Sequence, residues 1–459
     1  MEFRNLTPFD ALCFSALGVD DQEYPVLAMK VGYRLVPVDG QPGQLRAEVM
    51  DVKPVALCTD DAYYGEEGTS SVSEESDLAP FKPRCDVIVV GLAHAPQGLP
   101  ATSWNAGVRL SIPVAYEHRD VPLPEPLSPG ERLNEYQLQE WQAKRVAAAK
   151  AHANAPTRRN LLDKQLRFSG PRQFKDSLFG GWQLTQAQPV LSVPLRWEYA
   201  FGGSSVVRNP EHLLKPDSPE YLLNEVCYSN PLGSGWIEKR QEQLGFKLDA
   251  PLRELPAPQI EAIDRPVLHL DKAKHPDGLL DSTQMMQVAS TYKYQPAGFG
   301  VVGRAWAPRL ALAGNYDAVW QAERWPGLPY DFEFAYWNGA PSDQQIEFPP
   351  PNLRIELFNL TDPNLTPSGY AQVEMPGHRA FVLLRLFNGA LLPLPMLTDT
   401  LRIDTEAMTL VLTHRIHQFS TKTTALRAGM VKVPLSLSYL ASAATRLSAA
   451  AMPVWTGCS

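Results

Sequence analysis

Four carboxylates stand among aromatic residues and have the residue types of a glycosidase cleft, in which two carboxyl groups face each other at a fixed separation. They are Glu198, Asp317, Asp331 and Glu356, among Trp197, Tyr199, Tyr316, Trp320 and Phe332. A structural role is the stronger interpretation, because acids beside proline and aromatic residues commonly cap turns or pair with arginine. Arg304, Arg309 and Arg324 are available as such partners.

The remaining chemistry-bearing residue types are scattered. His414 and His417 are the only close pair of histidines, and on an expected strand two side chains three positions apart face opposite sides. Gly202-Gly203 and Gly298-Phe-Gly300 lack the lysine and threonine of a phosphate loop. No Gly-x-Ser-x-Gly elbow is present. We therefore expect no catalytic, cofactor-binding or metal-binding residue, no bound cofactor and no enzymatic activity.

Charge is unevenly distributed along the 459 residues. The net charge of −8 argues against non-specific nucleic-acid binding. All charged residues from Pro54 to Phe81 are acidic, whereas Lys144 to Lys175 contains nine basic residues and the single acid Asp163. Each block is either a solvated face or a surface for a partner of opposite charge.

The sequence also bears on the cellular compartment. The five cysteines form no Cys-x-x-Cys pair, and the N-terminal residues lack a basic region followed by an apolar core. No apolar run approaches the roughly 18 residues that cross a bilayer. These features predict a cytoplasmic protein that contacts neither membrane nor nucleic acid.

The elements that must position these residues are mostly strands. With 42 prolines, the composition favours short strands and long ordered loops over a helix bundle. We predict a mainly β fold of the α+β class, with an antiparallel sheet core, long Pro-rich loops and one inserted long helix. The expected strands are Tyr24 to Val38, Asp86 to His94 paired with Ala101 to Glu117, Leu353 to Leu360, Arg379 to Phe387, Thr400 to Ile403 and Met408 to Ile416.

One segment, Glu131 to Asn154, has the pattern of a long helix. Ser128 and Glu131 form a capping box, and Leu133, Tyr136, Leu138 and Trp141 give the helix an apolar patch. The patch either packs on the protein's own sheet or, with the basic stretch that continues to Lys175, recognises an acidic partner. A second, weaker helix is expected within Leu435 to Met452.

A short loop between Asp77 and Lys82 is a further candidate for binding. Its two charges flank Leu78 to Phe81, which indicates either an ordinary surface loop or a partly buried ion pair that fixes a docking loop. The candidate partner-binding residues are therefore Leu133, Tyr136, Trp141, Arg145, Arg158, Arg159, Asp77 and Lys82.

Two dense stretches carry a family resemblance. The first runs from Asp61 to Ser71 and from Glu75 to Pro83, followed by Asp86-Val, and the second runs from Pro296 to Gln344. With Asn5-Leu-Thr-Pro-Phe9 and Pro194 to Gly203, they resemble a bacterial family of unknown function whose members look like adaptor chaperones of type VI secretion.

The resemblance implies a non-enzymatic adaptor that binds an effector protein and loads it onto the valine-glycine-repeat spike or its tip. It implies one domain over residues 1–422, with two subdomains divided near 250–295. Residues 121–163 look like a helical insertion and 423–459 a Ser/Ala-rich tail outside the family pattern, and His414 stands where the family has tryptophan before arginine. The alternatives are a carbohydrate-binding or glycoside-hydrolysing protein, and a structural accessory of the baseplate or spike.

Overall fold

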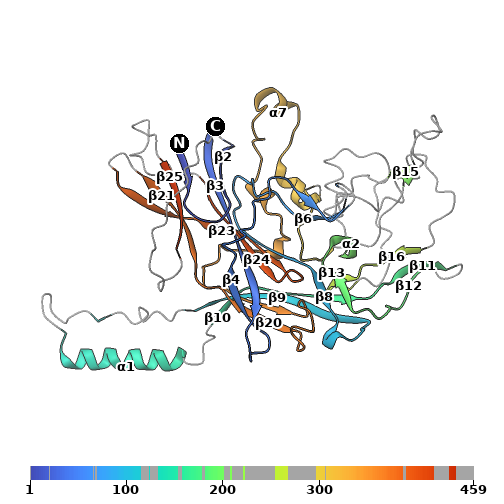
Figure 1. Ribbon diagram of the computed structural model, residues 1–459, viewed down its shortest axis with the longest axis horizontal. Helices are drawn as coiled ribbons and strands as arrows, with labels where there is room; N and C mark the ends of the chain where they lie inside the picture. The colour runs from blue at the N-terminus through green and yellow to red at the C-terminus, as the bar shows by residue number, and fades with distance from the viewer. Residues whose placement is uncertain are drawn as a thin grey trace.

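A computed structural model shows a mostly β protein built around one large curled sheet (Figure 1). It describes residues 2–19, 21–65, 67, 70–114, 123–124, 133–152, 158–177, 181–200, 207–208, 221–222, 254–266, 296–304, 306–385, 389–417 and 434–440. The mainly β prediction is confirmed.

The large sheet has twelve strands. In spatial order they are β17 (Ile260–Ala262), β10 (Arg158–Ser169), β9 (Ser103–Pro113), β19 (Arg354–Phe358), β20 (Tyr370–Glu374), β4 (Gln44–Val49), β3 (Glu23–Pro37), β24 (Thr409–His417), β23 (Leu397–Asp404), β7 (Cys85–Val90) and β18 (Gln345–Ile346), with β2 (Ala11–Leu17) also paired to β3.

Smaller sheets and short helices surround this sheet. The four-stranded sheet contains β1 (Glu2–Asn5), β25 (Pro434–Leu440), β21 (Arg379–Arg385) and β22 (Leu391–Pro395), and the three-stranded one β12 (Gly181–Leu184), β11 (Gln173–Ser177) and β16 (Glu254–Pro256). The two-stranded pairs are β13 (Ser192–Pro194) with β8 (Leu92–His94), β14 (Val207–Arg208) with β15 (Tyr221–Leu222), and β5 (Ala62–Tyr63) with β6 (Val72–Glu74).

In the part of the chain that the structure describes, every helix but one is a single turn or little more. The α-helices are α1 (Glu135–His152), α2 (Trp197–Ala200), α6 (Ala307–Leu310) and α7 (Ala318–Glu323). The 3-10 helices are η1 (Pro96–Gly98), η3 (Ala311–Ala313), η4 (Phe334–Trp337) and η5 (Ser342–Gln344).

The large sheet is mixed, which corrects the expectation of an antiparallel core. Most neighbours are antiparallel, but β23 runs parallel to β7 and β20 runs parallel to β4. In both pairs the partners are far apart in the sequence, and such non-local pairing leaves no signature in local turn residues. Sequence patterns indicate hairpins, which are antiparallel by construction.

The expected strands are largely confirmed, with one wrong pairing. β3 enters its hairpin through Gly40 and Gly43, both with positive φ. The run from Asp86 is broken at Gly91, whose φ of 118° suits glycine alone, and the chain turns there out of β7 into β8. The following strand, β9, therefore pairs with β10 and β19 rather than with β7.

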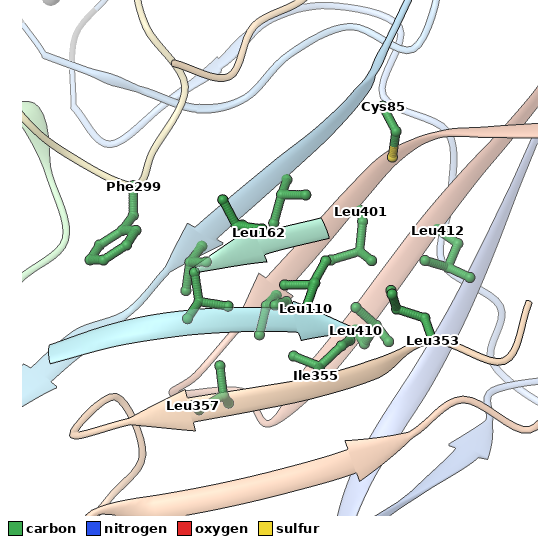
Figure 2. Packing of buried hydrophobic residues seen from close by; sticks show 14 of the residues in the cluster. Cys85, Leu110, Leu162, Phe299, Leu353, Ile355, Leu357, Leu401, Leu410 and Leu412 are labelled. Atoms are coloured by element: carbon green, nitrogen blue, oxygen red, sulfur yellow. The ribbon is translucent and has the colours of Figure 1, made fainter. Parts of the chain in front are cut away.

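The apolar core lies on one face of the central strands. Leu401, Leu410 and Leu412 from β23 and β24 gather with Leu110 and Ile355 from the other end of the curled sheet (Figure 2). All five side chains are buried in one continuous cluster. Alternation along each strand places the intervening residues on the opposite face.

The long helix begins at Glu135, four residues after its predicted start. Asn134 supplies the cap: its side chain accepts a hydrogen bond from the Gln137 backbone N–H at 2.8 Å, and the Gln137 side chain accepts one from the Asn134 N–H at 3.1 Å. The expected cap at Ser128 lies outside the described residues. Figure 1 shows α1 at the periphery, beside the large sheet rather than on it.

The tail contains a strand where a helix was expected. Pro434–Leu440 forms β25, which is parallel to β1 and antiparallel to β21. Alternation in Leu-Ser-Leu-Ser-Tyr-Leu has the period of a strand, and the helix prediction gave more weight to the alanines that follow. The remainder of the predicted helix lies outside the described residues.

Candidate functional site

A row of polar side chains crosses the face of the large sheet opposite the apolar core. Lys30 of β3, Thr413 of β24, Thr400 of β23 and Asp86 of β7 are neighbours in register. All but Thr400 are buried. A lysine and an aspartate within otherwise apolar strands need partners, because burying an unpaired charge is costly.

The first family stretch supplies the partners of Lys30. The Lys30 Nζ lies 2.6 Å from Asp77 Oδ2 and also binds Glu74. Asp77 further accepts hydrogen bonds from the Cys58 N–H at 2.8 Å and the Thr413 hydroxyl at 3.0 Å. Burial by itself lowers the pKa of Lys30, but the charges of Asp77 and Glu74 outweigh it and the net pKa is raised, so the ammonium form is favoured.

Asp86 is the meeting point of both family stretches. From the first, Lys82 Nζ donates to Asp86 Oδ2 at 2.8 Å. From the second, the Asn338 side-chain amide and the N–H groups of Gly339 and Ala340 donate to the same carboxylate at 3.0, 2.9 and 3.2 Å. Burial opposes the charge on Lys82, yet Asp86 and more distant acids raise its pKa overall. Asp86 thus ties two loops to strand β7.

Arginines of the second stretch bind acids of the first directly. Arg309 Nη1 lies 2.6 Å from Glu75 Oε1, and Arg304 lies 3.5 Å from Glu75 and 3.1 Å from Asp61. Gly339 stands so close to the Glu75 carboxylate that a Cβ at that position would collide with it. We call the set Lys30, Glu74, Glu75, Asp77, Lys82, Asp86, Arg304 and Arg309 the charged junction.

The charged junction leaves no room for a substrate. The cavity that Lys30, Glu74, Asp77 and Lys82 help to line has a volume of about 20 Å³, enough for about one water molecule. Within the described part of the chain, no cluster of three His, Cys, Asp or Glu side chains could hold a metal ion. The arrangement serves to fix irregular backbone against the sheet.

The four carboxylates considered for a glycosidase cleft have separate local partners. Glu198 accepts hydrogen bonds from the backbone and hydroxyl of Ser71 at 2.8 and 2.6 Å. Asp317 caps α7 through the Trp320 N–H at 2.9 Å, and Asp331 accepts from Asn315 at 2.7 Å. These contacts agree with the structural interpretation.

Glu356, the fourth, lies on β19 and accepts a hydrogen bond from the Tyr370 hydroxyl at 2.9 Å. Desolvation and this bond raise the pKa of Tyr370 to about 12. The tyrosine therefore remains a protonated donor at neutral pH, and the pair braces two neighbouring strands.

The loop charges predicted to pair with each other do not do so. Asp77 binds Lys30, and Lys82 binds Asp86, both fully within the fold. Neither side chain is more than 8% exposed, so each charge is buried in an ion pair with another residue and the two do not pair with each other across the loop. The partner of Asp77 lies on β3, a strand distant in sequence that local spacing cannot indicate, whereas Lys82 pairs with Asp86 only four residues further along the chain.

The other predicted partner-binding residues lie at or near the surface. On α1, Tyr136 is 73% exposed, and the Arg145 guanidinium stacks 4.7 Å from the centre of the Trp141 ring. Leu133 precedes the helix and is partly buried. At the start of β10, Arg158 donates to the Ser111 carbonyl at 2.8 Å, while Arg159 is largely exposed and lies 3.7 Å from Glu347.

Comparison with protein families identifies the scaffold. A family model described as "Uncharacterized protein conserved in bacteria (DUF2169)" matches residues 20–116 and 142–415. The chain belongs to this family. Neither the curated proteins nor the solved structures gave a match.

The family match and the geometry divide the molecule in the same way. The charged junction and all strands of the large sheet except β2 and the last two residues of β24 fall within the matched residues. Leu133, Tyr136 and Trp141 fall in the gap between the two matched segments. Among the helices of the described residues, none is long and apolar enough to span a membrane.

Proposed function

We propose that this family member is a non-enzymatic adaptor that binds a type VI secretion effector in the bacterial cytoplasm and helps to load it onto the spike protein or its tip. The resemblance of the two dense stretches to such adaptors is the basis of the role. Effector and spike component are then its partners, and no cofactor is required.

The observation that carries the proposal is the contrast between the interior and α1. The motif charges of the family are used internally, in a junction without space for a substrate. By contrast, α1 presents Tyr136 and the stacked Trp141–Arg145 pair at the molecule's periphery. Tyrosine, tryptophan and arginine are the residue types that contribute most to protein–protein binding.

The gap in the family match suits variable cargo recognition. A helix placed between two strands of a common scaffold can change from member to member without disturbing the core. The basic residues from Lys144 to Arg159 favour an acidic face on the effector. Residues 121–163 are the recognition insertion in this proposal: the gap in the match covers 121–141, and residues 142–163, with the basic residues, belong to the second matched segment.

The test is to purify the tagged chain from a bacterium with an active type VI system and identify co-eluting proteins by mass spectrometry. We expect one effector in stoichiometric amount, and loss of its secretion when the chain is absent. A chain from which residues 127–156 are deleted should remain folded and lose the effector. Unchanged effector secretion without the chain would refute the proposal.

A further inference from the structure

Strand β10 has a backbone edge that is only partly covered. Along one side, β10 pairs with β9 from Arg158 to Ser169. Along the other side, β17 pairs with Leu166, Arg167 and Phe168 only. Among the described residues the sheet therefore ends in a step, and no strand pairs with the first two thirds of β10 on this side.

Hydrogen bonds at the end of β10 show which of its backbone N–H and C=O groups point toward the open edge. The Ser169 N–H donates to the Gln259 carbonyl on the β17 side at 2.8 Å, and the Gly170 N–H donates to Thr102 on the β9 side at 3.1 Å. Because these directions alternate along a strand, Asp163 and Gln165 turn their N–H and C=O groups away from β9. The described residues offer these groups no backbone partner.

A cavity of about 490 Å³ adjoins this edge. Its floor is β10 from Asp163 to Leu166, and Pro296, Trp306 and Ile263 line it with apolar surface. Ile263 is 46% exposed although it directly follows the end of β17. The volume lies within the usual range for binding pockets of about 300–1,000 Å³.

We propose that the open edge of β10 binds an extended segment of the effector by strand addition, in line with β17. Continuity favours this occupant: β17 already pairs with the same side of β10, and the next positions, Gln165 and Asp163, repeat its geometry. Main-chain hydrogen bonds supply affinity in this mode of recognition, and pockets for alternate side chains supply specificity. That the occupant comes from the effector rests on the proposed function.

The walls of the cavity define the chemistry of the segment. Ile263 and Trp306 favour apolar side chains at alternate positions. Asp264 and Asp343 are 79% and 62% exposed in their side chains; Asp264 lies 3.8 Å from Arg265, which also lines the cavity, and Asp343 lies 2.8 Å from the buried Lys164. A lysine or arginine between the apolar positions would complement these carboxylates.

The test separates backbone from side chain at a single position. Gln165→Pro removes the N–H that faces the open edge and leaves the β9 ladder intact, whereas Gln165→Ala keeps the N–H and removes the same side chain. Random twelve-residue peptides displayed on phage are selected on the native full-length chain. We expect binding peptides to lose at least about tenfold in affinity with Gln165→Pro and less than about twofold with Gln165→Ala.

Because Gln165→Pro could misfold, a second test changes the peptide instead of the protein. Each selected peptide is also made with single N-methylated amides, which leave the protein untouched, and at alternate positions these should weaken binding to the native chain about tenfold. Failure to select any peptide, or peptides that bind all three proteins equally, overturns strand addition. An effector that co-purifies undiminished with Gln165→Pro would overturn it while leaving the adaptor role intact. If peptides are selected and depend on the Gln165 backbone N–H, but no effector co-purifies with the native chain, strand addition stands and the adaptor role is overturned.

Discussion

The single carboxylate of Asp86 receives four hydrogen bonds from two loops that are far apart in the sequence. Asp86→Ala leaves the buried Lys82 ammonium without its nearest counter-charge and leaves three donors unsatisfied. We expect unfolding free energy to fall by about 3–5 kcal/mol, measured by urea denaturation. Glu48→Ala, which breaks a surface pair with Arg46, should change it by less than about 1 kcal/mol. Equal effects of the two substitutions would contradict this account.

His414 makes stability depend on pH. Desolvation lowers its pKa to about 4, because it faces the apolar side of the sheet and its Nε2 has no hydrogen-bond partner. Unfolded histidine titrates near 6.5, so below that pH the unfolded state takes up a proton that the folded state refuses. The stabilising contribution is complete above pH 6.5 and falls by on the order of 3 kcal/mol as the pH drops to about 4.

A substitution isolates this contribution from other acid effects. His414→Leu removes the titrating group, and the loss of unfolding free energy between pH 7 and pH 4.5 should become correspondingly smaller than in the native chain. Urea denaturation at both pH values measures the difference. Parallel decreases in the native and variant proteins would show that His414 does not titrate in this window.

At the scale of elements, α1 contains stabilising contacts that its own sequence supplies. Its Asn134–Gln137 cap and the Glu140–Lys144 pair are both local. Since Tyr136 is 73% exposed, the alternative that the apolar patch packs on the protein's own sheet does not hold for this side chain. The Tyr136 side chain is therefore accessible at the surface.

Substitution of these aromatic residues should separate binding from stability. Tyr136→Ala with Trp141→Ala should weaken effector binding by at least about tenfold, as hot-spot residues do, and leave the melting temperature nearly unchanged. Trp325→Ala is the matched control, because Trp325 is 68% exposed and lies elsewhere on the surface. Isothermal titration with the purified effector measures the affinity of each variant, and thermal unfolding measures its melting temperature. Equal affinities for the double variant and the control would exclude α1 from the interface.

At the scale of the whole molecule, the charged junction couples two regions separated by more than two hundred residues. Glu75→Ala removes the acid that binds both Arg309 and Arg304. We expect backbone amides to exchange faster with deuterium in both segments, 58–82 and 300–340, because each is held in place by the other. Asp317→Ala, which removes a purely local cap on α7, should speed exchange there alone. Faster exchange confined to 58–82 would show that the segments are independent.

The sequence determined the features that depend on neighbouring residues. Local composition and pattern predicted β3, β19, β21 and β24 nearly to their ends and the central half of β23, since strand propensity is carried by consecutive side chains. The prolines and dense loop motifs predicted a mainly β protein with long ordered loops. Arg304, Arg309 and Arg324 do pair with acids, as expected. Their partners are Asp61, Glu75 and Asp21, however, and not the four carboxylates considered for a cleft.

Tertiary structure alone decided the pairings between distant segments. Three features depend on which strands lie side by side: parallel neighbours such as β7 and β23, the pairing of Asp77 with Lys30, and the open edge of β10. Asp86 reads in sequence as one acid in an apolar strand, and only the fold brings Asn338 and Gly339 to it. The physical reason is that ion pairs and sheet ladders act over a few ångströms in space, whatever the separation along the chain.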